Sequence, residues 1–576
     1  MPSFKQAALI VAMALSLALA ATLLPVVDDW RQVLNRASYR GNVPKQPELV
    51  LLTNVLGGFR GLLVDMVWMR AAKLQQAGKY WELYQLYDWI GKLEPHLEDV
   101  WVFNGWNMSY NLVAEHPVSE ARWQWIERAI RWLRDEGLRY NPRSGKIMKE
   151  ISWIYFHKIG RNLDPHNFYY KHRLALIMHS LLGPREMQDI PGIVAAPKEF
   201  SVLLADADVA KALSGFQLSP PETDIEAIAE AQALHHIPPP VRKVLLQPDN
   251  AEAWRKVRCY IARRVLTDTY KFDDTRDDED TIVIMEKLEE QFGKFDWRLP
   301  EPHAMFWAHR AMLTMDRVAE ENFFKARIDY DRLALFSLQE VMRRGVITYL
   351  TGKPEEPMVT SFDLSKVEPT NEMYHTLLAE YDATQDIYGA ESMINGHVQF
   401  LQEATYDLYF SGYEREALKY YRELNERYDK PLPRKTLENF CLGRVKEQVD
   451  TAGTEAKVRV LIDGCINQAL IFFCTNKMDE ARKWETVGRE AWNAFKNYEE
   501  LKESGIIRQG GFLPEWEDIL RGRIDSILRG KDFAFPRNLI PVLAAKLGVT
   551  SIKELESADF GEGVVPEIEA SSPPPE

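Results

Sequence analysis

Residues 64–95 have the sequence VDMVWMRAAKLQQAGKYWELYQLYDWIGKLEP, and a helical period runs through both halves of it. Apolar residues recur there every three or four positions, the spacing of one helix face: Val64, Val67, Ala71 and Leu74, then Leu83, Tyr87 and Ile90. Gly78 separates the two halves and Pro95 ends the second. Two short helices joined by a glycine turn form a hairpin. Because one hairpin cannot bury both of its faces, the pattern predicts further hairpins packed beside it.

Prolines that end one helix and precede the next recur along the chain. Pro95, Pro142 and Pro248 are each followed six residues later by a large apolar residue, namely Trp101, Met148 and Trp254. Two later segments show the helix–turn–helix pattern again: Thr405, Leu408, Gly412, Ala417 and Tyr421 form one set, and Ala469, Phe472, Ala481 and Gly488 form the other. The fold class predicted is therefore all-α and built from helical hairpins.

These segments resemble tetratricopeptide repeats, a family of helix–turn–helix units about 34 residues long. With Pro95 at the closing proline position, the family's large, small and apolar positions match in two units: Val67, Ala71, Leu74, Gly78, Tyr87 and Ile90, then Trp101, Gly105 and Met108. The resemblance covers residues 1–180 and 395–495, and it implies an α-solenoid. The layout of an apolar N-terminal segment followed by Trp-rich hairpins is similar to that of bacterial membrane-anchored tetratricopeptide-repeat proteins.

The sequence departs from the family pattern at two places. A position that is usually apolar is occupied by Arg70 in the first unit and by Asn104 in the second. The second unit also spans 142 − 95 = 47 residues, which we interpret as an insertion near 115–120, where His116-Pro117 indicates a loop.

In proteins of this family, five positions on the first helix of each repeat line a concave groove. The resemblance places two sets of residues there: Asp65, Trp68, Ala72, Gln75 and Gln76, then Asp99, Val102, Trp106, Ser109 and Tyr110. Because Trp and Tyr are frequent hot spots of protein interfaces, we expect Asp65, Trp68, Asp99, Trp106 and Tyr110 to contact a protein or peptide partner. Trp101 and Trp89 are expected in the core.

Residues 7–27 form an uncharged apolar stretch, AALIVAMALSLALAATLLPVV. As a helix, this stretch spans about 30 Å, the thickness of the hydrocarbon core of a bilayer. The sequence predicts an uncleaved transmembrane anchor, with a cleaved signal peptide and a buried soluble helix as alternatives. A very short head and a large body favour a single-pass protein with its body outside the cytoplasm, and the resemblance implies the bacterial inner membrane.

Composition and the positions of proline and glycine residues suggest how the chain is organised. The predicted segments are an anchor (1–29), a connector (30–55), a first helical block (56–183), a Pro-rich irregular insertion (184–248), a helical segment (249–350), a loop (351–372), a second repeat block (373–500), a C-terminal helical cap (501–555) and a disordered tail (556–576).

The charge balance limits the classes of function. Lys plus Arg total 71 and Asp plus Glu total 85, so the net charge is −14, which argues against nucleic-acid binding. The phosphate-loop, dinucleotide and zinc-protease motifs are absent from the sequence. The histidine pairs His172/His179 and His303/His309 lack the i, i+4 spacing of a zinc pair on one helix. The acidic run 273–280 lacks the Gly and Glu of a calcium loop.

We therefore expect a membrane-anchored scaffold that binds partner proteins without catalysis and without a cofactor or metal. Two alternatives remain: an all-helical carbohydrate-active enzyme outside the cytoplasm, and a secreted binding protein with a cleaved signal. The four cysteines, at 259, 441, 465 and 474, are expected to be buried and unbridged. The sequence does not specify the oligomeric state.

Overall fold

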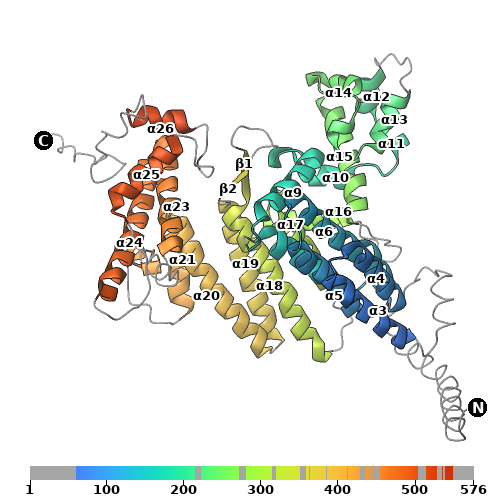
Figure 1. Ribbon diagram of the computed structural model, residues 1–576. Coiled ribbons are helices and arrows are strands. Elements are labelled where there is room, and N and C mark those ends of the chain that lie inside the picture. Colours follow the sequence, from blue (N-terminus) through green and yellow to red (C-terminus); the bar gives the residue numbers. More distant parts are fainter. Residues whose placement is uncertain are drawn as a thin grey trace, which may run out of the picture. The chain divides into compact units, whose positions relative to one another are not determined.

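The computed structural model describes residues 60–161, 163–214, 222–270, 281–313, 320–349, 358–361, 363–384, 386–410, 413–428, 436–441, 443–444, 455–503, 514–528, 535 and 539–548. These residues fall into two compact units, Met1–Val341 and Met342–Glu576. Over this part of the chain the protein is helical, except for one two-stranded hairpin (Figure 1). The predicted anchor at 7–27, the acidic run at 273–280 and the tail at 556–576 lie outside the described residues. None of the helices described combines the length and apolarity needed to span a bilayer.

The first unit begins with helical pairs and continues through a set of shorter helices. Its first elements are α3 (Arg60–Gln76), α4 (Tyr80–Leu93), α5 (Glu98–Asn107), η2 (Met108–Leu112), α6 (Ser119–Trp132), η3 (Leu133–Gly137), α7 (Leu138–Tyr140), α8 (Gly145–Trp153), η4 (Ile154–Gly160) and α9 (Asn167–Leu182). The segments η2, η3 and η4 are π-helical.

The later elements of this unit are shorter until α15. They are η5 (Arg185–Met187), α10 (Ile190–Ala195), α11 (Phe200–Leu204), α12 (Ala207–Ser214), α13 (Glu222–Glu230), η6 (Leu234–His236), α14 (Pro239–Leu245), η7 (Pro248–Asn250), α15 (Ala251–Thr269), α16 (Thr281–Phe292), α17 (Pro300–Leu313) and α18 (Glu320–Arg344), the last of which crosses the boundary between the units.

Helices α3 and α4 form the hairpin that the opening sequence predicts. Gly78 adopts a φ of 68° at the turn, a conformation that favours glycine. The apolar stripe of α4 is buried, with Leu83, Tyr87 and Ile90 at most 1% exposed. Trp89 lies off this stripe and is 63% exposed, so its predicted core position is wrong. At about 100° per residue, Trp89 lies about 200° from Tyr87, on the solvent side of the helix.

Trp101 is the centre of the core between α4, α5 and α6, as its position in the repeat predicts. It is fully buried, and its indole Nε1 donates a hydrogen bond to the carbonyl oxygen of Pro95 at 3.0 Å. Its ring lies 4.6 Å from that of Trp132 and 5.8 Å from that of Tyr140, measured between centroids. The backbone of α4 lies close to this ring at Gly91, where a Cβ atom would lie only 2.8 Å from the ring.

A 47-residue spacing relates two neighbouring helix pairs, α5–η2–α6 and α8–η4–α9. Direct contacts join residues 47 positions apart: Asp99 with Lys146, Tyr110 with His157, Ser119 with His166, and Trp123 with Tyr170. Trp101 and Met148 share the same spacing and are both fully buried. The residues of the two pairs that contact each other are therefore separated by the same interval as Pro95 and Pro142.

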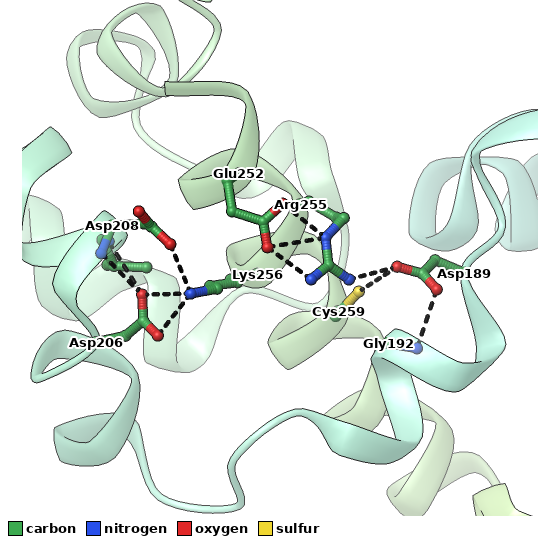
Figure 2. Close-up of polar contacts among 9 residues, drawn as sticks. Asp189, Gly192, Asp206, Asp208, Glu252, Arg255, Lys256 and Cys259 are labelled. Atoms are coloured by element: carbon green, nitrogen blue, oxygen red, sulfur yellow. Dashed lines mark hydrogen bonds and ion pairs between the residues drawn. The ribbon is translucent and has the colours of Figure 1, made fainter. Parts of the chain in front are cut away.

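The Pro-rich segment 184–248 carries short helices that are attached to α15 by ion pairs (Figure 2). Arg255 of α15 bonds Asp189 at 2.7 Å, and Asp189 also accepts a hydrogen bond from the backbone N–H of Gly192 at the start of α10. Lys256 contacts both Asp206 and Asp208 at 2.7 Å. Burial tends to raise the pKa of Asp189, but hydrogen bonds from Arg255 and Gly192 outweigh it and hold that pKa below its ordinary value.

The second unit begins with a β-hairpin and continues with long helices. Its elements are β1 (Val346–Tyr349), β2 (Met358–Ser361), η9 (Leu364–Lys366), α19 (Val367–Ala383), α20 (Ile387–Phe410), α21 (Glu414–Arg427), α23 (Glu455–Cys474), α24 (Met478–Glu503), α25 (Trp516–Leu528) and α26 (Ile540–Lys546). The hairpins α20–α21 and α23–α24 lie where the two later periodic segments predict them. All four cysteines of the chain are buried and free.

The segment 351–372, predicted as a loop, contains regular structure. Residues 358–361 pair antiparallel with 346–349, with Ile347 opposite Thr360. Five of these eight residues are valine, isoleucine or threonine, the β-branched residues that favour strands. Helix α19 begins at Val367, and Pro369 is accommodated because it lies in the first turn, where a backbone N–H has no helical partner.

Candidate functional site

The five residues predicted to bind a partner all lie in the first unit, and the structure brings some of them together. Trp68 on α3 and Tyr110 on η2 are half-buried, and Trp106 on α5 is 39% exposed. Asp65 is exposed on α3. Asp99 is also exposed and forms an ion pair with Lys146 at 3.0 Å.

The three aromatic members belong to a continuous line of rings, which we call the aromatic strip. Its residues are Trp68, Phe103, Trp106, Tyr110, His157 and Trp153. Successive centroids are separated by 5.4, 6.3, 5.9, 5.7 and 4.5 Å in that order. These distances are typical of interacting aromatic pairs. The strip runs from α3 across α5 and η2 to α8 and η4, so it crosses three successive helical layers of the chain.

The strip is partly open to solvent. Phe103 is 47% and Trp106 39% exposed, whereas Trp68, Tyr110 and Trp153 are half-buried. Rings held by neighbouring rings lose little conformational freedom when a partner covers them, which lowers the entropic cost of binding. The strip is therefore a pre-formed apolar surface with exposed area at its centre.

Two π-helical segments place the polar members of the strip opposite each other. Tyr110 lies in η2 and His157 in η4, and the Tyr110 hydroxyl is hydrogen-bonded to His157 Nδ1 at 3.0 Å. A π-helical turn adds a residue to the helix and rotates the side chains that follow it, and such turns are frequent at functional sites. Burial lowers the pKa of His157, and the nearby Arg161 and Lys158 lower it further, so the imidazole is neutral at pH 7.

A half-buried carboxyl group lies beside the strip. Glu150 on α8 is close enough to Tyr110 to raise the pKa of that phenol, after the larger effect of burial. Burial raises the pKa of Glu150 itself to about 7, although Lys149 opposes the shift. Its Oε1 atom is buried and has no hydrogen-bond partner among the described residues. A carboxyl group with an unfilled acceptor beside aromatic rings is suited to receive a cationic side chain.

Three of the other groove positions on α3 line a polar hollow. An open depression of about 640 Å³ is bordered by Ala72, Gln75, Gln76, Ala77, Gly78, Tyr80 and Glu115. Gln75 connects it to the core, since its Oε1 lies 3.5 Å from Asn107 Nδ2, and Asn107 also donates to the Tyr87 hydroxyl. Three of the five positions predicted on α3 thus border this hollow, and Trp68 belongs to the strip.

The repeat alignment missed half of the strip. Phe103 lies outside the five groove positions, and His157, Trp153 and Glu150 lie in a helix pair that the 34-residue period does not align. The 47-residue spacing contains the missing signal, because Trp106 and Tyr110 shifted by 47 give Trp153 and His157. Comparison with protein-family models, with curated proteins and with solved structures found no match to this chain.

Proposed function

We propose that this protein is a membrane-anchored scaffold that binds protein segments through the aromatic strip. The observation that carries the proposal is the strip itself, a line of six rings that is exposed at Phe103 and Trp106. Interface hot spots are enriched in Trp and Tyr, and they act from well-packed positions surrounded by neutral contacts. The strip has this composition and packing.

We also propose that the helix pairs belong to an α-solenoid that resembles tetratricopeptide repeats. Support comes from the pairs α5–η2–α6 and α8–η4–α9, whose residues contact their equivalents 47 positions away. Small residues lie where helices approach closely, as at Gly105, where a Cβ atom would lie 2.6 Å from Leu133. A solenoid extends its binding surface with each added repeat, which agrees with a strip that crosses successive helices.

The chemistry of the strip indicates the kind of partner segment. Aromatic rings with partial exposure bind apolar and aromatic side chains, and Glu150 offers an anionic partner to a lysine or arginine. Binding of such a cation favours the ionised carboxylate, whose pKa is otherwise raised by burial. We therefore expect a segment that combines an apolar anchor with one basic residue.

The proposed anchor is the apolar stretch 7–27. With the body outside the cytoplasm of a bacterial cell, this stretch would hold the strip close to the inner membrane. Partners at that surface would meet the strip at a raised effective concentration, so modest intrinsic affinity would be sufficient.

Crosslinking in native membranes followed by mass spectrometry tests this function. The wild-type chain is expected to capture discrete protein partners, and Trp106→Ala is expected to weaken that capture at least tenfold, the effect of losing about 1.4 kcal/mol. Trp89→Ala is the matched control, because Trp89 is more exposed than Trp106 and is not part of the strip. Equal capture by the wild type and Trp106→Ala, with both chains folded, would remove the strip as the binding surface.

Two further measurements separate the alternatives. Aromatic rings also stack on sugars, so a carbohydrate-active enzyme predicts quenching of tryptophan fluorescence by oligosaccharides and no protein partners. N-terminal sequencing of the mature chain decides between an anchor and a cleaved signal, since cleavage near Ala20 would remove the apolar stretch.

A further inference from the structure

Three side chains from three helices of the second unit converge on one point. His375 lies on α19, His397 on α20 and Glu423 on α21. One ligand atom from each, an imidazole nitrogen or a carboxylate oxygen, lies within 4.8 Å of the others. His375 Nε2 is 2.7 Å from Glu423 Oε1, and His397 Nε2 is 3.8 Å from the same oxygen.

We propose that His375, His397 and Glu423 form a zinc site that fastens α19, α20 and α21 together. Two imidazoles and one carboxylate are a known ligand set for zinc, and they leave the fourth position to water. Ligand atoms at about 2.05 Å in a tetrahedron are separated by ~3.3 Å. The separations of 2.7 and 3.8 Å lie on either side of that value, so shifts of about half an ångström suffice to complete the geometry.

The surrounding residues are arranged as a second coordination shell. Asn371 on α19 donates from Nδ2 to Glu423 Oε2 at 2.9 Å, which leaves Oε1 facing the two histidines. The Tyr428 hydroxyl lies 2.6 Å from His397 Nδ1, the nitrogen that would not face the metal. Metal-bound histidines usually have such a partner on their second nitrogen, where it fixes the tautomer and the ring orientation.

Zinc would replace two hydrogen bonds of the metal-free site, because His375 Nε2 is bonded to Glu423 Oε1 there and His397 Nε2 to Asn371 Oδ1. His397 Nε2 lies 2.7 Å from Asn371 Oδ1, an arrangement in which Nε2–H donates to the amide oxygen. For Nε2 to bind zinc, the imidazole proton must reside on Nδ1 and be donated to the Tyr428 oxygen. The hydroxyl of Tyr428 can both donate and accept, so the same contact serves the metal-free and the metal-bound site.

The burial of the three ligands suits a site that is held firmly and can still be reached. His397 is fully buried, whereas the side chain of His375 is 36% exposed and that of Glu423 is 20% exposed. His397 also packs against Tyr374 and Phe400 at ring distances of 5.0 and 6.2 Å. The metal would enter from the side of His375, and the apolar rings behind His397 would limit solvent access.

The test is zinc binding by the full-length chain, free of any histidine tag and stripped with a chelator. The wild type is expected to bind one equivalent of zinc in competition with a chromophoric chelator, and Co²⁺ is expected to give the visible spectrum of a four-coordinate nitrogen–oxygen site. Glu423→Gln keeps the size of the side chain and removes its charge, and it is expected to lower the zinc affinity at least tenfold. Tyr428→Phe is expected to lower it about 10- to 100-fold, the range for second-shell partners.

Glu426→Gln provides the control, because Glu426 is exposed on the same helix and is not a member of the cluster. It is expected to bind zinc like the wild type. Failure of the stripped wild type to bind zinc, or equal affinity in the wild type and Glu423→Gln, would overturn the proposal. If a variant fails to fold, hydrogen exchange of the wild type, measured with and without zinc, tests the site instead. Zinc must slow exchange in 367–383 and 414–427, and unchanged exchange there would contradict the site.

Discussion

At the scale of single residues, Asn104 is a polar side chain in the apolar core of the first compact unit. Asn104 occupies a position that is usually apolar in the resembling family, and it is fully buried on α5. Within the part of the chain that the structure describes, neither of its amide atoms has a hydrogen-bond partner. A buried amide in this state costs about 1–3 kcal/mol relative to a satisfied one.

We therefore expect Asn104→Leu to raise the free energy of unfolding of the first unit by about 1–2 kcal/mol. Leucine has nearly the same shape and carries no polar atom. Urea unfolding followed by tryptophan fluorescence measures the change. Asn104→Ala should gain less, because it leaves a cavity; a loss of stability in Asn104→Leu would show that the amide has a partner after all.

Glu150 gives a prediction for the dependence of stability on pH. The native state raises its pKa from 4.5 to about 7, so the folded protein holds the proton more tightly than the unfolded chain does. The contribution of Glu150 to the free energy of unfolding is therefore greatest below pH 4.5 and falls as the pH rises from 4.5 to about 7. Above about pH 7 this contribution no longer changes.

Glu150→Gln removes this penalty, since the amide does not ionise. We expect the variant to be more stable than the wild type at pH 8, by on the order of 1–2 kcal/mol after allowance for partial exposure. At pH 5 the two should differ little. Urea midpoints measured at both values check the prediction, and an equal difference at pH 5 and pH 8 would rule out ionisation of Glu150 as the cause.

At the scale of elements, close helix contacts depend on small residues around Trp101. A Cβ atom at Gly91 would lie 2.8 Å from the Trp101 ring, whereas at Gly137 it would lie 3.4 Å away, an ordinary contact. The Trp101 ring is fully buried, so neighbouring atoms prevent it from moving away from an added methyl group.

Gly91→Ala is therefore expected to destabilise the first unit by about 1–3 kcal/mol, although alanine favours the helix. Gly137→Ala is the matched control, and it is expected to be neutral or slightly stabilising. Thermal unfolding of both variants provides the measurement. Equal stability of the two would show that α4 and α5 can separate enough to admit a methyl group.

The same elements show what the sequence can predict. The hairpins α3–α4, α20–α21 and α23–α24 follow from apolar spacing, because each buries a single stripe. Trp89 is exposed despite its large apolar side chain because its angle on α4, and not its residue type, decides which side of the helix it occupies. The hairpin of β1 and β2 was missed because strands of four residues are too short to show a period.

At the scale of the whole molecule, sites made from several elements are the hardest to predict. The sequence identified three rings of the aromatic strip through their family positions, and the 47-residue interval indicates two more, Trp153 and His157, but not Phe103. The proposed zinc ligands are separated by 397 − 375 = 22 and 423 − 397 = 26 residues on three helices. Spacing within one helix therefore reveals nothing about them, and only the packing of α19, α20 and α21 brings them together.

If a partner binds at the aromatic strip, a photo-crosslinking amino acid in place of Phe103 should capture that partner. Phe103 is 47% exposed within the strip, and Trp89, at 63%, is the control position outside it. Illumination of native membranes is expected to give a discrete crosslinked protein from position 103 and none from position 89. Crosslinking from position 89 alone, or the same products from both positions, would contradict the account.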